Sequence, residues 1–275
     1  MLHNGNTLVQ GGHGQSLAIS VMVPLGARSG DARRCLAALR AADPAPDEII
    51  VVSDGPVQDL DAVADAFGAV LCVLDRPAGP AAARNRGAEQ ARGDILMFVD
   101  SDVEVHSDAI GVVMHALEAD PEVSAVFGSY DDEPAERNLL SQYKNLAHHF
   151  THQVGREEAF TFWAGCGAIR RDVFVRAGGF SESYARPAIE DIELGYRLTR
   201  EGARIRLLKN LQCKHLKRWT PVMLFRSDVF DRAIPWTRLI LQTRSGPSDL
   251  NLRWSQRLCV VLAWVCAVCA GWALH

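Results

Sequence analysis

The chain has 275 residues, of which 48% are hydrophobic and 23% are charged, a composition that is ordinary for a globular protein and argues against disorder. This length allows one full hydrophobic core, or a core with an appended segment. The net charge of -4 hides an asymmetry: residues 200–257 contain 13 Lys/Arg and 4 Asp/Glu, a balance of +9, which leaves -13 on the first 199 residues.

Strand and helix patterns alternate along the first part of the chain. Short apolar runs predict strands, and apolar residues at helical spacing predict helices between them. In chain order we expect a strand at 17–23, a helix at 31–42, a strand at 48–52, a helix at 59–67, a strand at 70–74, a helix at 81–91 and a strand at 95–99. This order indicates right-handed βαβ units and a mostly parallel sheet flanked by helices, as in nucleotide-binding α/β domains.

Polar residues follow three of these strands where they end. Pro24, Asp54 and the pair Asp100 and Asp102 should lie along one rim of the sheet, which is where such sheets bind ligands. Asp54 has two compatible interpretations: it accepts hydrogen bonds from a base or ribose, or it closes an Asx-turn.

The segment Asp100-Ser101-Asp102 follows a continuous apolar strand. Side chains alternate along extended backbone, so the two carboxylates point to the same side. Two oxygen donors there suit Mg²⁺ or Mn²⁺ holding a phosphate-bearing substrate. The alternative is that this segment caps a following helix, but Ser107-Asp108 offers a better cap for the helix predicted at 109–119.

A Gly79-Pro80 pair opens the helix predicted at 81–91, and Arg84 lies one turn inside it. Its guanidinium is suited to the oxygens of a diphosphate. An Ala-rich helix with exposed arginines is the alternative. Further along, Gly165 allows close approach of a ligand to the backbone, and Trp163 could stack on that ligand, although a core tryptophan is the commoner outcome.

Glu190, Asp191 and Glu193 begin an amphipathic helix. The helix dipole favours acids at this position, which explains one of them more easily than three. A carboxylate here could instead remove the proton of an attacking acceptor hydroxyl. His215, a lone histidine after this helix, is either structural or a metal ligand through its neutral imidazole.

The C-terminal part is basic and then apolar. Residues 221–257 mix arginines with large apolar side chains, which indicates amphipathic helices at a membrane interface rather than ordinary surface helices. Leu258 to Leu274 contains 17 residues without a charge, the lower limit for a membrane span. With Arg253 and Arg257 before it, we predict a transmembrane helix over 258–275, either minimal or cut short, in place of a buried core helix.

By the positive-inside rule, this basic flank places the preceding domain in the cytoplasm, at the inner membrane. Residues 1–16 are Gly-rich and polar, which predicts a flexible tail without a secretory signal. The seven cysteines are an odd number scattered through predicted elements, so we expect no disulfide framework and a reducing compartment.

These motifs together resemble the inverting, membrane-associated family 2 glycosyltransferases with the GT-A fold. The resemblance covers Leu17 to Trp219 and rests on the segments at Pro24, Ser53-Asp54-Gly55, Ala83-Arg84-Asn85-Arg86-Gly87, Gly93-Asp94, Asp100-Ser101-Asp102, Gly178-Gly179-Phe180 and Glu190-Asp191. It implies a GT-A domain over 17–220.

The resemblance also implies roles for individual residues. Asp54, Arg84 and the region of Pro24 would bind the nucleotide of the donor, and Asp100 would approach its ribose. Asp102 would be the metal ligand of the family's DxD motif, with His215 as a second ligand. Asp191 would be the catalytic base, and Glu190 would orient the acceptor or the loop.

Two departures from the family pattern limit these implications. An Asn-Glu pair commonly follows the proline where this chain has Leu25-Gly26-Ala27-Arg28, which leaves base recognition open. The segment His215-Leu216-Lys217-Arg218-Trp219 resembles the QxxRW motif of processive relatives with His in place of Gln, which leaves polymer synthesis open.

We therefore expect a metal-assisted glycosyltransferase that uses a nucleotide-sugar donor, by resemblance a UDP-sugar, and a lipid or saccharide acceptor, with inversion. Its other predicted partner is a membrane, and no nucleic acid is expected. The alternatives are a nucleotidyltransferase, for which residues 25–30 are a poor phosphate loop, or a non-catalytic sugar- or lipid-binding membrane protein.

Overall fold

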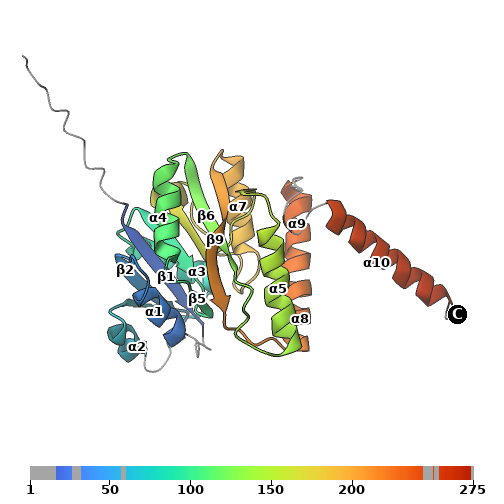
Figure 1. Cartoon of the computed structure of the whole chain (residues 1–275), viewed down its shortest axis with the longest axis horizontal. Helices are drawn as coiled ribbons and strands as arrows, with labels where there is room; N and C mark the ends of the chain where they lie inside the picture. Colours follow the sequence, from blue (N-terminus) through green and yellow to red (C-terminus); the bar gives the residue numbers. More distant parts are fainter. Residues whose placement is uncertain (1–16, 27–31, 57–59, 244–249, 251–253, 274–275) are drawn as a thin grey trace, which may run out of the picture.

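The computed structural model describes residues 17–26, 32–56, 60–243, 250 and 254–273 (Figure 1). The tail predicted at 1–16 lies outside these residues. The strands are β1 (Ile19–Leu25), β2 (Glu48–Ser53), β3 (Val70–Val73), β4 (Ile95–Val99), β5 (Val103–Val105), β6 (Val123–Tyr130), β7 (Glu158–Ala159), β8 (Cys166–Arg170) and β9 (Arg204–His215).

The helices alternate with the first strands and then gather in the C-terminal part. They are α1 (Ala32–Arg40), α2 (Leu60–Ala66), α3 (Pro80–Gln90), α4 (Ala109–Ala119), α5 (Leu139–Gln153), α6 (Arg171–Arg176), α7 (Glu190–Arg200), α8 (Pro221–Arg226), the π-helix η1 (Ser227–Ala233), α9 (Ile234–Thr243) and α10 (Trp254–Ala273).

The strands form one mixed sheet in the order β3-β2-β1-β4-β8-β6-β9-β5, with β7 paired to β9. The first four strands in this order are parallel to one another, as the alternating strands and helices predicted. Beyond β4 the sheet is mixed, because β8 runs antiparallel to both β4 and β6. Two antiparallel steps bring β6 back to the direction of β4, so the carboxyl ends of β1, β2, β4 and β6 share one rim.

Alternate side chains of each central strand enter two separate hydrophobic layers. In β4, Met97 packs with α1, α2 and α4 on one face, whereas Leu96 and Phe98 pack with α3, α6 and α7 on the other. Both faces of the strand are buried, which explains why its sequence is continuously apolar.

Pro24 lies inside β1, whereas the sequence pattern ended this strand before the proline. The pairing explains the difference. β1 pairs with β4 only from Ile19 to Met22, so the missing N–H of Pro24 removes no hydrogen bond on that side of the strand. Near the other end of the chain, β9 is one strand of 12 residues.

The segment α8-η1-α9 runs beside α5 in Figure 1. Lys144 of α5 forms an ion pair with Asp228 of η1. The indole Nε1 of Trp236 in α9 donates to the hydroxyl of Tyr196 in α7, 3.3 Å away. Leu239 is buried beside Tyr196. The C-terminal helices before α10 are therefore attached to both α5 and α7.

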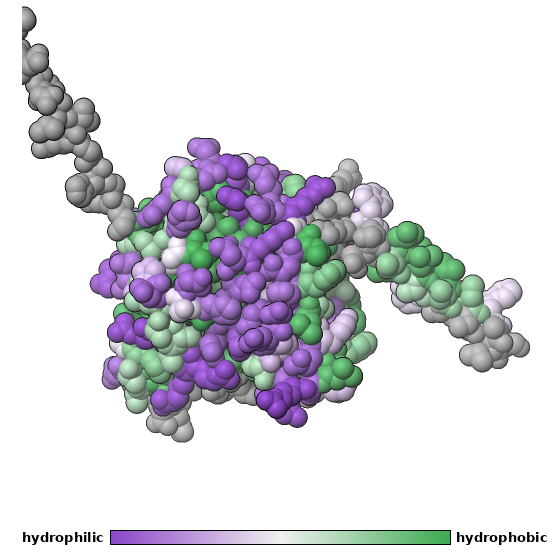
Figure 2. Space-filling view, viewed as in Figure 1, coloured by the Kyte–Doolittle hydropathy of each residue, from purple (hydrophilic) through white to green (hydrophobic). Residues whose placement is uncertain are grey.

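The transmembrane helix predicted over 258–275 is not found. In the part of the chain that the structure describes, no helix is long and apolar enough to cross a membrane. The helix α10 extends from Trp254 to Ala273, and its first turn contains Arg257. Figure 2 shows apolar residues along α10.

Candidate functional site

Three of the predicted site positions lie at the carboxyl ends of neighbouring parallel strands. Pro24 pairs with Val52 near the end of β1 and β2, and Asp54 and Asp100 directly follow β2 and β4. Tyr130 ends β6 on the same rim. The sheet order, β2-β1-β4-β8-β6, therefore gathers these residues along one edge.

Arg84 joins two carboxylates that are far apart in the sequence. Its NH2 donates to Asp100 Oδ1 at 2.6 Å and its NH1 to Glu190 Oε1 at 2.8 Å, and its side chain is only 5% exposed. The other Glu190 oxygen accepts the Ala188 N–H at 2.9 Å. Two of the guanidinium nitrogens are thus occupied by carboxylates, whereas the third, Nε, is buried without a hydrogen-bond partner among the described residues.

The two acids of Asp100-Ser101-Asp102 have different surroundings. Burial raises the pKa of Asp100, and the charge of Asp102 adds to this effect, whereas Arg84 opposes it. Burial also acts on Asp102, but His215 and Lys217 outweigh it and lower the pKa to about 2. Asp102 Oδ2 lies 3.8 Å from His215 Nε2 and 3.7 Å from Lys217 Nζ. Asp102 is therefore the more fully ionised of the two.

Asp191 lies at the start of α7, beside Glu190. Its Oδ2 accepts the N–H of Ala164 at 3.1 Å. Burial, followed by the charge of Glu190, raises the pKa of Asp191 to about 6, although Arg84 opposes the shift. A carboxylate with this pKa is ionised at neutral pH and is a stronger proton acceptor than an ordinary aspartate.

Close packing fixes the position of Ala164 relative to Asp191. Gly195, one turn along α7, has no room for a side chain, because a Cβ there would lie 2.4 Å from the backbone N of Phe162. The helix therefore packs directly against the backbone of the segment that contains Ala164. Gly165 follows in this segment, and its carbonyl accepts the Asp100 N–H at 3.1 Å.

An aromatic wall connects these groups. The Tyr130 ring stacks on His215 with centroids 4.3 Å apart and an angle of 10°. Trp163 meets Tyr130 edge-on at 5.0 Å, and His148 of α5 lies 4.6 Å from Trp163. Burial lowers the pKa of His148 well below its ordinary value and lowers the pKa of His152 to about 4. Both rings are therefore neutral at pH 7. Trp163 is part of this wall and half-buried.

Asp54 is bonded to the loop before α3. Its Oδ1 accepts the N–H groups of Ala78 at 2.6 Å and Gly79 at 3.1 Å. Gly79 has a φ of 91°, and a Cβ there would lie 2.6 Å from the carbonyl oxygen of Ala185. Asp54 thus holds a turn that only glycine fits, and this contact lies apart from the Arg84 cluster.

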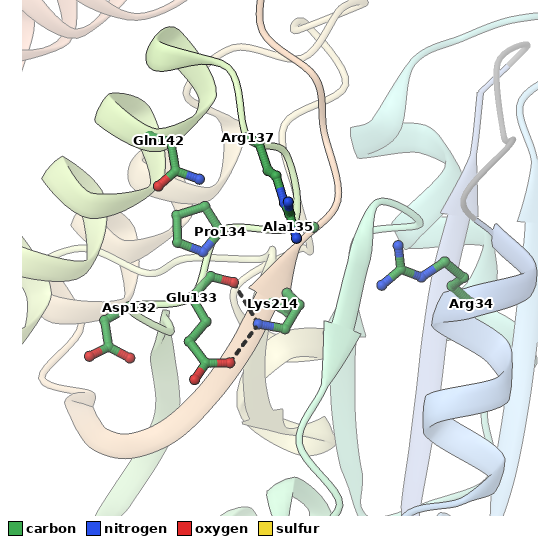
Figure 3. Close-up of a pocket in the computed structure, with 8 residues that line it drawn as sticks. All are labelled: Arg34, Asp132, Glu133, Pro134, Ala135, Arg137, Gln142 and Lys214. Atoms are coloured by element: carbon green, nitrogen blue, oxygen red, sulfur yellow. Dashed lines mark hydrogen bonds and ion pairs between the residues drawn. The ribbon is translucent and has the colours of Figure 1, made fainter.

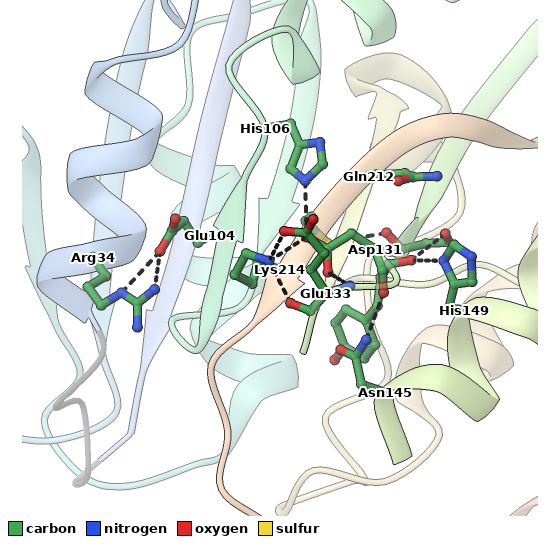
Figure 4. A network of polar contacts seen from close by, with 12 residues as sticks. Arg34, Glu104, His106, Asp131, Glu133, Asn145, His149, Gln212 and Lys214 are labelled. Atoms are coloured by element: carbon green, nitrogen blue, oxygen red, sulfur yellow. Dashed lines mark hydrogen bonds and ion pairs between the residues drawn. The ribbon is translucent and has the colours of Figure 1, made fainter. Parts of the chain in front are cut away.

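An open pocket of about 470 Å³ lies beside the rim (Figure 3). Its lining residues are Arg34, Asp132, Glu133, Pro134, Ala135, Arg137, Gln142 and Lys214. Lys214 Nζ lies 3.0 Å from Asp131 Oδ2, and the same carboxylate oxygen lies 3.2 Å from His106 Nε2 (Figure 4). The Lys214 ammonium is thus already paired within the protein, and the pocket adds no unpaired lysine to the rim.

The side chains that could hold a metal ion are Asp102 and His215. Among the residues that the structure describes, no three His, Cys, Asp or Glu side chains converge to hold a metal. An ionised carboxylate and an imidazole 3.8 Å apart still fit a divalent cation that takes its remaining ligands from substrate phosphates and water. This pair is thus a partial site, which a phosphate-bearing ligand would complete.

The structure brings together most of the residues predicted from the sequence, and adds others. Arg84, Asp100, Glu190 and Asp191 form one cluster, and Asp102 pairs with His215. Sequence reasoning missed Tyr130 and His148. The run from Val123 to Tyr130 ends in a polar residue like the earlier strands, and this signal could have placed Tyr130 on the rim.

Comparison with known proteins identifies the family. The sequence profile described as Glycosyl transferase family 2 matches residues 20–177, more than half of the chain. The chain therefore belongs to glycosyl transferase family 2, which confirms the family predicted from its motifs.

Curated relatives match part of the chain. It is 26% identical over 157 residues to the glucosyl-dolichyl phosphate glucuronosyltransferase of Haloferax volcanii, covering 54% of this chain and 50% of the relative. It is 28% identical over 201 residues to the pre-mycofactocin glycosyltransferase of Mycobacterium tuberculosis, covering 68% of this chain and 40% of the relative. The chain thus spans about half, or less, of the length of these relatives.

Solved structures share the fold. The mannosyltransferase PcManGT of Pyrobaculum calidifontis, in complex with GDP-Man and Mn²⁺, superposes with a TM-score of 0.59 at 19% identity, covering 76% of this chain and 60% of that one. TarS of S. aureus superposes with a TM-score of 0.58 at 16% identity, covering 72% of this chain and 60% of the TarS chain. These likenesses confirm an α/β fold of the GT-A type.

Proposed function

We propose that this chain transfers a sugar from a nucleoside-diphosphate donor to a hydroxyl acceptor, with inversion at the anomeric carbon and with a divalent metal. The observation that carries the proposal is the position of Asp191. Asp191 combines a pKa of about 6 with a hydrogen bond from the Ala164 N–H. The guanidinium of Arg84 links its neighbour Glu190 to Asp100.

The donor side is the rim at Asp100 and Asp102. Asp102 and His215 would hold Mg²⁺ or Mn²⁺, which supplies positive charge to stabilise the leaving diphosphate. Lys217, 3.7 Å from Asp102, adds a second positive charge there. Asp100 would face the ribose, and Pro24 and Asp54 border the place of the nucleotide. Relatives of this fold bind GDP-Man or UDP-GlcNAc, which supports a nucleotide-sugar donor, and we favour a UDP-sugar.

Asp191 would act on the acceptor side. A single displacement needs one base, which takes the proton of the acceptor hydroxyl as its oxygen attacks the anomeric carbon. Glu190, held by Arg84 and the Ala188 N–H, would keep the start of α7 in position. Trp163 and Gly165 would border the acceptor. A lipid or saccharide hydroxyl fits this role.

The test is the Asp191→Asn variant, with Asp172→Asn as a matched control on the exposed surface of α6. We expect Asp191→Asn to lose transfer from a nucleotide sugar and to keep the stabilisation that UDP with Mn²⁺ gives in a thermal-shift assay. Asp172→Asn should retain both. Transfer by Asp191→Asn at the wild-type rate would refute the base assignment. If UDP with Mn²⁺ does not stabilise the wild-type protein, a non-catalytic binding protein becomes the better interpretation.

We also propose that the helices from α8 to α10 lie on a membrane surface, with the sheet domain on the cytoplasmic side of the inner membrane. Large apolar side chains on these helices are exposed, and they are Val222, Phe225, Phe230, Leu241, Leu258, Val261 and Trp264. Arginines occur between them on α8 and α9, as in helices that lie at an anionic interface.

A further inference from the structure

One side of the segment η1-α9 faces the body of the protein. Asp228 contacts Lys144 of α5, and Trp236 contacts Tyr196 of α7. Arg232 lies midway between Asp228 and Trp236, four residues from each. Four residues are close to one helical turn, so Arg232 lies on the same side of the segment. Arg232 is exposed, and it lies on the side of the segment that carries the contacts with α5 and α7.

His148 borders the gap between α5 and α7. It is one turn beyond Lys144 on α5, which runs beside η1-α9 (Figure 1), and the charge of Arg232 acts on its ring. His148 Nδ1 is buried and has no hydrogen-bond partner among the described residues. Asp191 starts α7 on the other side of the gap. A buried ring nitrogen without a partner indicates that this gap receives a polar ligand.

Arg232 has no hydrogen bond or ion pair with any other described side chain. Asp228 on the same helix is occupied by Lys144. The charge of Arg232 nevertheless reaches the site. Burial and Glu190 raise the pKa of Asp191, and Arg232 is a small opposing influence; burial and His152 lower the pKa of His148, and Arg232 adds to that decrease. An unpaired guanidinium next to a catalytic carboxylate is available to bind an anion.

The other charges of the site show why a negatively charged acceptor would need Arg232. Asp100, Asp102, Glu190 and Asp191 are opposed mainly by Arg84, which is already bonded to two of them. An acceptor with a negative group would be repelled by these carboxylates. Lys217 lies on the donor side, beside Asp102. Arg232 approaches from the opposite, C-terminal side, beside Asp191.

We propose that Arg232 binds a phosphate group of the acceptor, close to the hydroxyl that Asp191 deprotonates, and that His148 borders this phosphate. The proposal rests on the function proposed above and adds the chemical class of the acceptor. Arginine suits this role, because its planar fork can donate two parallel hydrogen bonds to phosphate oxygens.

The experiment compares full-length Arg232→Gln with wild type, and uses Arg226→Gln as a control. Arg226 is an exposed arginine of α8, two residues before Asp228 and off the side of the helix that faces the body. Butyl phosphate serves as the acceptor-side probe, titrated calorimetrically with saturating UDP and Mn²⁺ so that the donor side is occupied. UDP with Mn²⁺, titrated alone, is the donor-side probe.

We expect Arg232→Gln to weaken butyl phosphate binding by about 10- to 100-fold, the usual effect of losing a charged hydrogen bond. Binding of UDP with Mn²⁺ should stay within about 2-fold of wild type. Arg226→Gln should match wild type with both probes. Arg232→Lys should recover part of the butyl phosphate affinity, because it keeps the charge without the fork.

Equal butyl phosphate affinity in wild type and Arg232→Gln, or no binding by wild type, would overturn the acceptor-phosphate proposal while leaving the proposed function intact. Weaker UDP binding with unchanged butyl phosphate binding would also overturn it, and would assign Arg232 to the donor diphosphate instead. If the wild-type protein does not bind UDP with Mn²⁺, the proposed function is refuted, and this inference with it.

Discussion

Asp102 and Asp191 have different pKa values because their neighbours differ. Burial acts on both. Asp102 has His215 and Lys217 beside it and is held at a pKa of about 2, whereas Asp191 has the acidic Glu190 as its neighbour and is raised to about 6. This separation suits one carboxylate to a permanent negative charge and the other to accepting a proton.

The pKa of Asp191 predicts the pH dependence of transfer. The acid form cannot accept a proton, so kcat/KM should rise about tenfold per pH unit below pH 6 and level off above it. Initial rates between pH 5 and pH 8 with a fixed donor would measure this. A rate that stays constant through pH 6 would contradict the role of Asp191.

Arg84 should be important for stability. Its removal leaves Asp100 and the 6% exposed Glu190 side chain without their cation, and breaking a buried pair in this way typically costs about 3–5 kcal/mol. We expect Arg84→Gln to lower the free energy of unfolding by an amount near the lower end of that range, because Asp100 is one-third exposed. Chemical denaturation would measure the change.

Arg86→Gln is the matched control on the same helix, since the Arg86 side chain is 47% exposed and its ion pair is with the exposed Glu89. Its unfolding free energy should stay close to that of the wild-type protein. Similar losses of unfolding free energy in Arg84→Gln and Arg86→Gln would show that α3, rather than the buried charge cluster, is sensitive to substitution.

At the scale of elements, α7 depends on its close approach to residues 161–162. Gly195→Ala should improve intrinsic helix propensity by about 1 kcal/mol, but the added Cβ meets backbone atoms of Thr161 and Phe162. We expect a net destabilisation of about 1–3 kcal/mol, with reduced transfer because the Ala164 N–H moves away from Asp191. Thermal unfolding and initial rates measure the two effects.

Gly111→Ala is the helical control for this variant. Its Cβ would lie 3.1 Å from Pro44 Cδ, a less severe approach than the 2.4 Å between a Cβ at Gly195 and the Phe162 backbone N. Its effect on stability should be clearly smaller. Gly195→Ala with wild-type stability would show that the contact between α7 and residues 161–162 is not tight.

At the scale of the whole molecule, the exposed apolar residues of α8 to α10 predict attachment to lipid. Phe225→Ser together with Phe230→Ser should reduce co-sedimentation with vesicles of 30% phosphatidylserine by about tenfold or more, because each phenylalanine side chain contributes roughly 1.5–3 kcal/mol when buried. Val175→Ser, an exposed apolar position on α6, should have no effect. Equal binding of all variants, or none by wild type, would contradict the membrane proposal.

The sequence alone was enough for the order of elements and the rim of the sheet. Buried strands are recognisable because both faces must be apolar, and Asp54, Asp100 and Asp102 follow such strands directly. Parallel pairing then places their ends together. The family motifs added the positions of Asp191 and His215. The predicted C-terminal span is not found in the part of the chain that the structure describes.

Only the tertiary structure decided how these residues are paired and charged. The contact of Arg84 with Glu190 joins positions 106 residues apart, and no local pattern encodes it. The pKa of Asp191 depends on burial and on Glu190, and the position of Arg232 depends on contacts of its helix with α5 and α7. Periodicity determines which face a side chain occupies, whereas charge and reactivity depend on distances across the fold.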